Sequence, residues 1–320
     1  MKNFVINKES LFKIDSALEG QDLKQYDLEI ENIVNNLWKG IGEFEEMLSP
    51  FFTNTLKNEL LPSLYINYLS LVKLEEKYEN INVKATTSII DIIGKNLNFK
   101  LDPNRTNYDL ELNLRGENFF KLHQKTSDFF WKRTLRKIRG QVSLYWAKLN
   151  GIEVLFMNAG KLKKDFSMIP NSLDAIYIYQ SKSKQVMPNI ESIKNVVKKN
   201  IYGINLSIPS ELVIELIEQK IFKYLYTTLN RIFILAEFID KHKVKLVISS
   251  AATHEAFLCL FAAAKLAKID SLIIPHGFVT NSNPKLDNYC TYQGTINDFE
   301  PRYKGVHQIR FKTYWFGKKI

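Results

Sequence analysis

The most informative pattern of apolar and polar positions lies toward the end of the chain. Residues 244–248 form a short, β-branched apolar run, which is typical of a buried strand. Residues 256–267 are rich in alanine, leucine and phenylalanine, and Thr253 before them can cap a helix. Residues 272–274 are apolar on both faces, as in an interior parallel strand. This stretch predicts a right-handed strand–helix–strand unit.

A histidine follows the second of these strands. Pro275 ends the strand, and Gly277 allows backbone or ligand to approach the side chain of His276. The polar loop that begins at Thr280 and Asn281 comes next. Because open α/β sheets bind their ligands at the carboxyl ends of strands, we expect His276 to face a ligand. The alternative is a hydrogen-bonded structural histidine.

A second strand with a polar end is expected over residues 152–157. It leads into Asn158, Gly160 and Lys161, and a strand followed by small residues and a lysine can receive a phosphate or a sugar. The segment matches neither the Walker A spacing nor the dinucleotide-binding glycine pattern. A plain strand-to-loop turn is therefore the alternative.

The remaining pattern predicts an α/β protein. Residues 22–80 show helical periodicity, residues 88–93 a short helix and residues 102–120 a polar surface loop. A long amphipathic helix is expected over residues 209–240, with a break near 227–228. The fold class is thus a Rossmann-like, mainly parallel sheet flanked by helices, with strands near residues 83, 154, 177, 246 and 273.

Composition favours a globular protein. The 320 residues are 45% hydrophobic, which is enough for a sizeable core. The two cysteines, Cys259 and Cys290, give no support for a disulfide framework, so a reducing compartment is expected. Charges interrupt the start of the chain, and no uncharged run is long enough to span a bilayer. We therefore expect a cytoplasmic protein.

The formal net charge is +10, and its densest basic cluster lies in residues 132–139. Aromatic residues flank this cluster within residues 129–146. A basic helix with aromatic edges suits the anionic inner face of the plasma membrane. It could also hold the phosphates of a lipid-linked acceptor, or be an ordinary polar helix face. Nucleic acid is not expected as a partner, because no known reader motif accompanies the charge.

Metal and serine-nucleophile chemistry are not indicated by the sequence. The five histidines show no paired ligand spacing, and the acid-x-acid sequence at residues 109–111 lies in alternating polar and apolar surroundings. The nucleophile-elbow sequence of serine hydrolases is also missing. We expect no cofactor and no metal.

The order of elements resembles a known family. An apolar strand, an alanine-rich helix, a second strand ending in His-Gly, a polar loop and a further short strand are similar to the N-terminal domain of GT-B glycosyltransferases. The nearest relatives build bacterial capsule, lipopolysaccharide and teichoic-acid-type polysaccharides. The matching segments are residues 247–250, 253–255, 262–264, 275–277 and 287–294, with 315–318 as a further candidate.

The resemblance implies sugar transfer from a nucleotide-sugar donor to a saccharide or lipid-linked acceptor. In related transferases the histidine of the His-Gly pair is the proposed base, a role that falls here on His276. Glu255, next to His254, is the second candidate, although an acid in the first turn is also an ordinary helix start. The expected substrate-binding residues are Asn158, Gly160, Lys161, Ser249, Ser250, His254, Gly277, Thr280 and Asn281.

The resemblance also sets the expected domain organisation. Residues 1–310 would form the acceptor-side domain of a GT-B fold, helix-rich over 22–80, and residues 311–320 would begin an interdomain linker. No second series of strand–helix units follows His276, so the donor domain is expected to be missing. A GT-A enzyme is not expected, because it would need a metal-binding Asp-x-Asp. A non-catalytic scaffolding module of a polysaccharide-assembly complex and a sugar-nucleotide epimerase remain as alternatives.

Overall fold

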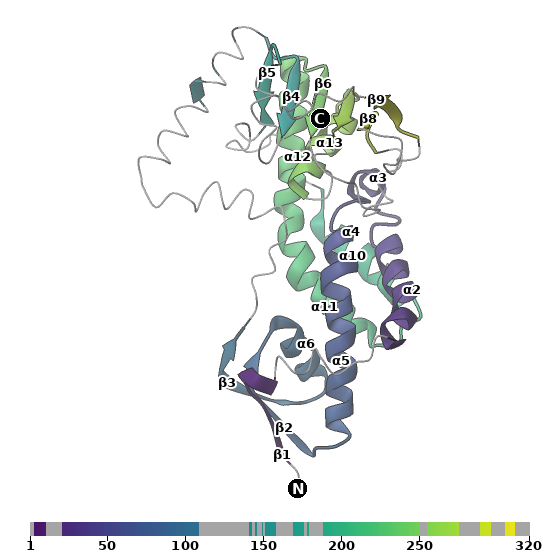
Figure 1. Ribbon diagram of the computed structural model, residues 1–320, viewed down its shortest axis with the longest axis vertical. Coiled ribbons are helices and arrows are strands. Elements are labelled where there is room, and N and C mark those ends of the chain that lie inside the picture. Colours follow the sequence, from purple (N-terminus) through teal and green to yellow (C-terminus); the bar gives the residue numbers. More distant parts are fainter. Residues whose placement is uncertain are drawn as a thin grey trace, which may run out of the picture. The chain divides into compact units, whose positions relative to one another are not determined.

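The computed structural model describes most of the chain (Figure 1). The described residues are 3–10, 21–108, 141, 142, 145, 149, 151–157, 169–175, 178, 188–249, 255–274, 289–295 and 305–310. The chain divides into two compact units, each made of three segments. Unit 1 contains Met1–Glu45, Phe52–Asn113 and Asn189–Leu225, and unit 2 contains Glu46–Phe51, Leu114–Pro188 and Tyr226–Ile320. Each unit has its own parallel sheet.

Helices make up much of unit 1, as the periodicity of residues 22–80 predicted. In chain order they are α2 (Gln21–Asn36), α3 (Phe44–Leu48), α4 (Thr53–Thr55), the π-helical turn η1 (Leu56–Leu60), α5 (Leu61–Glu75), α6 (Ser88–Asn96), α10 (Ile190–Tyr202), α11 (Ser210–Ile217) and the π-helical turn η3 (Glu218–Phe222). The end of α3 belongs to unit 2. Leu60, Leu61 and Leu64 are fully buried between these helices. Their burial supplies the hydrophobic stabilisation of the unit.

Two polar side chains hold α2 in place within unit 1. Glu29 on α2 accepts hydrogen bonds from the Tyr65 hydroxyl at 2.8 Å and from the Ser207 amide at 2.9 Å. The side-chain amide of Asn200 donates to the Asn36 carbonyl, at the last residue of α2, at 2.9 Å. Such bonds satisfy backbone groups that a helix end leaves unpaired. They connect three stretches of chain that lie far apart in the sequence.

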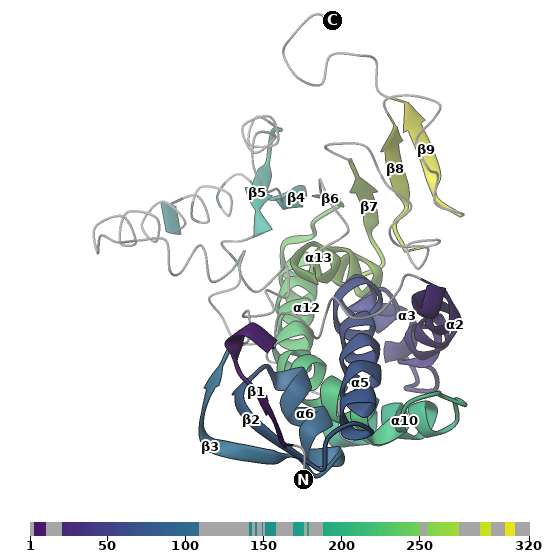
Figure 2. The same ribbon diagram turned by 60° about the horizontal axis from the view of Figure 1, so that its bottom comes forward.

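The sheet of unit 1 has three parallel strands in the order β1-β2-β3 (Figure 2). They are β1 (Asn3–Ile6), β2 (Asn80–Thr86) and β3 (Lys100–Asn107). The strand predicted near residue 83 therefore exists, but its expected place in one sheet with the later strands is wrong. β1 and β3 occupy both edges of β2, so β2 has no edge left for another sheet. Strand pairing of this kind depends on distant residues and is not encoded locally.

The connection from β2 to β3 differs in detail from the prediction. Thr87 caps α6 by accepting a hydrogen bond from the Ile90 amide at 3.3 Å, and the helix continues beyond residue 93. Residues 102–107, expected in a surface loop, belong to β3 instead. Pro103 is tolerated there because it lies between Leu101 and Thr106, where the register with β2 shifts and no strand partner is lost. The rest of that predicted loop, from residue 109, lies outside the described residues.

The sheet of unit 2 has six parallel strands. They are β4 (Val154–Met157), β5 (Ser172–Asp174), β6 (Leu246–Ser249), β7 (Asp270–Ile273), β8 (Tyr292–Thr295) and β9 (His307–Arg310), in the spatial order β5-β4-β6-β7-β8-β9. β6 and β7 are parallel neighbours, as predicted. The helix α13 (Glu255–Leu266) joins them and packs against both. The α/β class with parallel sheets flanked by helices is thus confirmed.

One face of this sheet carries an apolar cluster. Phe156, Ile248 and Leu272 are register neighbours on β4, β6 and β7, and Ile274 completes the cluster just after β7. Residues in register point to the same face of a sheet, so this row forms a continuous buried layer. Burial of this row accounts for the apolar residues on one face of each of these short strands.

Two predicted elements are displaced. The expected strand near residue 177 is wrong in position, because β5 ends at Asp174 and residue 178 lies in a turn. The long helix has no break at 227–228, since Thr228 lies buried inside α12 (Lys223–His242). The irregularity is η3, where a π-helical turn joins α11 to α12. A π-turn inserts an extra residue and rotates the buried face without ending the helix.

Candidate ligand-binding site

The strand order of unit 2 contains a point where the direction of winding reverses. From β4 the chain crosses to β5 on one side, whereas β6 leads to β7, β8 and β9 on the other. β4 and β6 are neighbours, so the two windings diverge between them. In open parallel sheets a crevice opens at this reversal, outside the carboxyl ends of the two strands, and ligands bind there. The same order, with the second strand outside the first, is found in flavodoxin-like sheets.

The described residues at this reversal are largely buried. Met157 at the end of β4 is the register partner of Ser249 at the end of β6, and both are fully buried. The Ser249 carbonyl accepts a hydrogen bond from the Ile274 amide at 2.8 Å. The pairing of β6 with the chain beyond β7 therefore extends to the strand ends. The candidate site would therefore lie on hydrogen-bonded strand ends.

Ser249 is a predicted binding residue whose side chain the structure describes, and it lies at this edge. Glu255 is the first residue of α13, but its side chain lies outside the described part. Eight further predicted residues and the predicted base also lie outside it: Asn158, Gly160, Lys161, Ser250, His254, Gly277, Thr280, Asn281 and His276. In the sequence, Asn158 directly follows β4 and Ser250 directly follows β6. Two of the predicted segments therefore begin at adjacent strand ends.

The sequence analysis missed an acidic residue beside this site. Asp174 is the last residue of β5 and the register neighbour of Phe156 on β4, and it is 5% exposed. The sequence pattern favours a strand near residue 177, which puts Asp174 before a strand instead of at its carboxyl end. The sequence feature that could have located this strand is Leu173, a single apolar residue between the polar residues Ser172 and Asp174.

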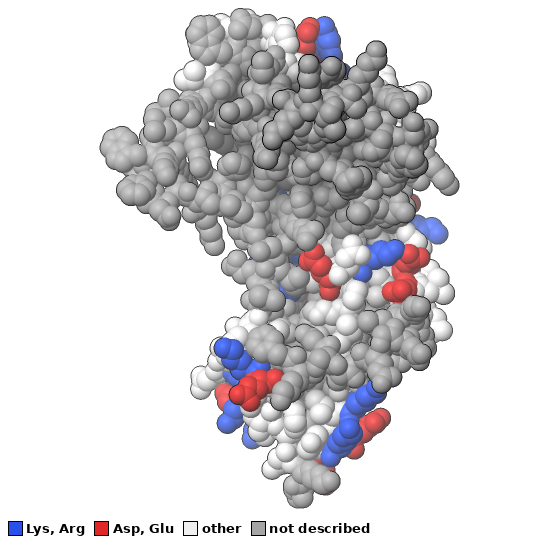
Figure 3. Space-filling view, viewed as in Figure 1, with Lys and Arg blue, Asp and Glu red and all other residues white. Residues whose placement is uncertain are grey.

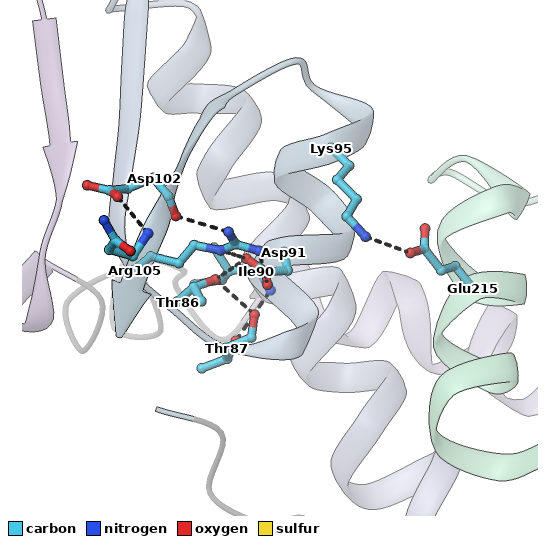
Figure 4. Close-up of polar contacts among 9 residues, drawn as sticks. Thr86, Thr87, Ile90, Asp91, Lys95, Asp102, Arg105 and Glu215 are labelled. Atoms are coloured by element: carbon cyan, nitrogen blue, oxygen red, sulfur yellow. Dashed lines mark hydrogen bonds and ion pairs between the residues drawn. The ribbon is translucent and has the colours of Figure 1, made fainter. Parts of the chain in front are cut away.

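A second polar cluster lies at the carboxyl end of β2 in unit 1 (Figure 4). Arg105 on β3 donates from Nε to Oδ1 and from Nη2 to Oδ2 of Asp91 on α6, both at 2.8 Å. The Thr86 hydroxyl, at the end of β2, donates to Asp91 Oδ1 at 2.7 Å. Arg105 Nη1 also donates to the Asp102 carbonyl at 3.0 Å. The side chains of Arg105 and Asp91 are 23% and 20% exposed, respectively.

The charges of this cluster are matched within it. Burial alone would raise the pKa of the Asp91 carboxyl, but the hydrogen bonds from Arg105 and Thr86 and the arginine's charge outweigh it, so the pKa lies below its ordinary value. Asp91 is therefore ionised at neutral pH, and the forked pairing uses both of its oxygens. We interpret the cluster as a structural contact that joins α6 to β3, and not as a ligand site.

The described cysteines offer no reactive thiol. Cys259 and Cys290 are free and buried, and burial raises the pKa of the Cys290 thiol to about 12. A thiol with such a pKa is a poor nucleophile at neutral pH. Within the described ranges, no group of three or more His, Cys, Asp or Glu side chains could hold a metal ion.

On the face drawn in Figure 3, the described charged side chains are of both signs. Figure 3 shows Lys and Arg next to Asp and Glu on this face. Among the described residues, Lys57 forms an ion pair with Glu31, and Lys198 forms one with Glu218, both in unit 1. Exposed pairs of this kind contribute little to stability. They also leave no patch of a single sign on this described face.

No protein-family model, curated protein or solved structure matches this chain. Among the described helices, none combines the length and apolar character needed to cross a bilayer.

Proposed function

We propose that this protein is a metal-independent GT-B-type glycosyltransferase of surface-polysaccharide synthesis, or its acceptor-binding half. The observation that supports the proposal is the winding reversal between β4 and β6, since parallel sheets commonly bind ligands outside such strand ends and Ser249 lies at one of them. The segments that begin at Asn158 and Ser250 follow the two strands that flank this crevice. His276 comes two residues after Ile274, which follows the adjacent β7.

The proposed reaction is transfer of a sugar from a nucleotide-sugar to an acceptor hydroxyl with inversion. His276 takes the proton from the acceptor hydroxyl while the oxygen attacks the anomeric carbon and the nucleotide leaves from the opposite face. A histidine suits this role because its pKa lies near the working pH. Glu255 is the second candidate base. Residues 158–161 and 249–250 would hold the phosphate or sugar groups through backbone and side-chain hydrogen bonds.

The test compares His276→Ala with His307→Ala, a change at an exposed histidine of β9 in the same sheet. Purified protein that includes any downstream donor domain is given a panel of nucleotide-sugars with and without saccharide acceptors, and released nucleotide and extended acceptor are measured separately. We expect His276→Ala to lower transfer by roughly a hundredfold to ten-thousandfold, the range for losing a positioned base. Hydrolysis of the donor should fall less, because water bypasses the missing base more readily.

The outcomes separate the alternatives. Transfer at the parental rate by folded His276→Ala would make this histidine structural and would turn attention to Glu255. Saccharide binding without any turnover, in the parent protein and in both variants, would favour the scaffolding module. Interconversion of sugar-nucleotide epimers without an acceptor would favour an epimerase.

The proposal includes peripheral contact with an anionic membrane on the cytoplasmic side. Val142, Tyr145 and Leu149 have helical backbone conformations and are 48%, 62% and 60% exposed. Their spacing of three and four residues puts them on one helical face. The basic residues 132–139 precede them in the sequence. Apolar side chains beside basic charge favour an interfacial helix.

Vesicle sedimentation tests this contact. We expect the protein to bind vesicles that contain phosphatidylglycerol, in a manner weakened by salt, and to ignore phosphatidylcholine vesicles. Reversing the charges at Arg133, Arg136 and Arg139 to Glu should abolish the binding. The control reverses three exposed lysines of unit 1 to Glu, which changes the net charge equally: Lys77, Lys84 and Lys100. Equal loss in both triple variants would show a general charge effect and contradict the proposed surface.

A further inference from the structure

We infer that the outer face of the unit 1 sheet binds an acidic saccharide chain whose rings carry carboxylates. The outer face consists of the side chains that alternate with the inward-facing residues of the three strands: Asn3, Val5, Asn80, Asn82, Lys84 and Lys100. The inference deepens the proposed function by naming the class of acceptor, and it rests on that function for the acceptor role. The binding itself depends only on residues of unit 1.

The outer face lies on the side of the sheet away from α6. Val83 of β2 and its register neighbour Leu101 of β3 face α6, where a Cβ at Gly94 would be 3.1 Å from Leu101 Cδ2 (Figure 2). Successive side chains of a strand point to opposite faces, so Asn82 and Lys84 point away from this helix. Parallel sheets usually have both faces buried under helices and carry apolar residues on both. An exposed polar face is therefore unusual for a parallel sheet and favours a role in binding.

Two ammonium groups of the outer face have no ion pair among the described residues. Lys100 is the register neighbour of Asn82, and Lys84 follows Asn82 by two residues. The spacings of a sheet put the two lysine Cα atoms roughly 8 Å apart. Both side chains are exposed, whereas Lys57 and Lys198 of the same unit are each paired with a glutamate. Two like charges at this separation attract an anion that lies between them.

Amide side chains lie beside the lysines. Asn80 Nδ2 donates to Oδ1 of Asn3, its register neighbour on β1, at 3.3 Å. Asn82 is partly exposed and is the register neighbour of Val5, which is 38% exposed. Amide groups both donate and accept hydrogen bonds, as the hydroxyls of a sugar do. The exposed aliphatic side chain between them can contact the C–H face of a sugar ring.

The groups of the outer face suit a carboxylate better than a phosphate. Peptide N–H groups of a strand point toward the neighbouring strands, so the face lacks the backbone donors with which helix N-termini bind phosphate. An ammonium beside a side-chain amide, as with Lys100 and Asn82, can donate to both oxygens of one carboxylate. Asp102 follows on β3, but its Oδ1 accepts a hydrogen bond from the Asn104 amide at 2.8 Å, and the two lysines outnumber it. The outer face therefore fits a chain of uronic acid rings.

Calorimetric titration of the whole protein, without a donor sugar, tests this binding. The probes are oligogalacturonate, its fully methyl-esterified form and poly(glycerol phosphate). We expect the parent to bind oligogalacturonate more tightly than the other two. Lys84→Gln combined with Lys100→Gln should weaken oligogalacturonate by roughly tenfold and leave the ester unchanged, because only the acid contacts the ammonium groups. Asn82→Ala should weaken the acid and the ester by a similar factor, because the amide also contacts hydroxyls.

The matched control is Lys73→Gln combined with Lys77→Gln, which removes two exposed charges of the same unit, at the end of α5 and just beyond it. Thermal unfolding verifies that the variants fold, and Lys84→Arg combined with Lys100→Arg keeps both charges and should retain the preference for the acid. The inference is overturned if the parent binds no oligogalacturonate or binds the ester equally well. It is also overturned if the control weakens binding as much as the test pair, or if poly(glycerol phosphate) binds more tightly.

The same measurements separate this inference from the glycosyltransferase proposal. Binding of oligogalacturonate that depends on Lys84 and Lys100, without any sugar transfer, would sustain the inference while contradicting the proposed function. Sugar transfer to an acceptor whose binding does not depend on these lysines would contradict the inference alone.

Discussion

Asp91 and Arg105 show how a pair of charged side chains can serve the fold alone. Their forked hydrogen bonds join α6 to β3, and the Thr86 hydroxyl takes part of the remaining acceptor capacity of Asp91. Because about a fifth of each side chain is exposed, breaking the pair leaves a partly buried charge without its partner. We expect Asp91→Asn to lower the free energy of unfolding by about 1–3 kcal/mol at pH 7, measured by urea denaturation.

The pH dependence of the same variant gives a sharper test. The pKa of Asp91 is lower in the folded protein than in the unfolded chain, so its contribution is present above about pH 4 and is lost as pH falls through the folded pKa. The stability difference between parent and Asp91→Asn should therefore shrink in acid. As a control, Glu31→Gln breaks the exposed pair with Lys57 and should change stability by less than about 1 kcal/mol. A stability difference between parent and Asp91→Asn that grows in acid would contradict the proposed structural role of the pair.

At Gly94, the backbone of α6 lies close to the side chains of Leu101 and Phe99. A Cβ at this position would lie 3.1 Å from Leu101 Cδ2 and 3.6 Å from Phe99 Cδ2. Alanine improves helix propensity by about 1 kcal/mol, which offsets the small shift that Leu101, a half-buried side chain, must make. We expect Gly94→Ala to stay within about 0.5 kcal/mol of the parent in urea denaturation.

Gly94→Val adds two methyl groups to the same tight space. Overpacking of this kind costs about 1–3 kcal/mol, and a β-branched residue gains less helix propensity than alanine. The variant should therefore unfold at a clearly lower urea concentration than Gly94→Ala. Equal stability of the two variants would show that α6 and β3 are not in close contact at this point.

At the same scale, the sequence predicted the elements whose pattern is uniform. β6, α13 and β7 are mainly apolar and largely buried, so their positions were found within two residues. β5 was misplaced because residues 172–174 alternate and the following residues look more strand-like. β3 was missed because Pro103 and its polar neighbours resemble a loop. In both strands, pairing with a neighbour outweighs the local preference.

The candidate site could be predicted in part. Parallel strands rich in Val, Ile and Leu imply ligands at their carboxyl ends, which led to Ser249 and to the segments after β4 and β6. The reversal between β4 and β6 depends on strand order. Strand order is set by contacts between distant residues, and one sequence does not display it.

For the whole molecule, the interleaving of the units limits how the chain can be divided. Residues 1–113 lack the third segment of unit 1, which carries α10 and α11. Without it, Glu29 loses Ser207 and the end of α2 loses Asn200. We expect a fragment of residues 1–113 to show helical circular dichroism but no cooperative thermal transition, because its apolar faces stay uncovered.

The control joins residues 1–113 to 189–225 through a long glycine–serine linker. This protein contains the three segments of unit 1 and should unfold cooperatively. A cooperative transition in the short fragment, at the temperature of the linked protein, would contradict the assignment of residues 189–225 to the core of unit 1.

The same interleaving bears on how the protein is made. The ribosome releases the chain from its N-terminus. The first two segments of unit 1 therefore cannot complete their fold until residues 189–225 have emerged. By then β4 and β5 have already left the ribosome, whereas β6, which pairs with the other edge of β4, comes later. The nascent chain thus carries an unpaired apolar strand edge during much of its synthesis. Such an edge is a template for aggregation, and we expect the growing chain to depend on chaperones that bind it before β6 arrives.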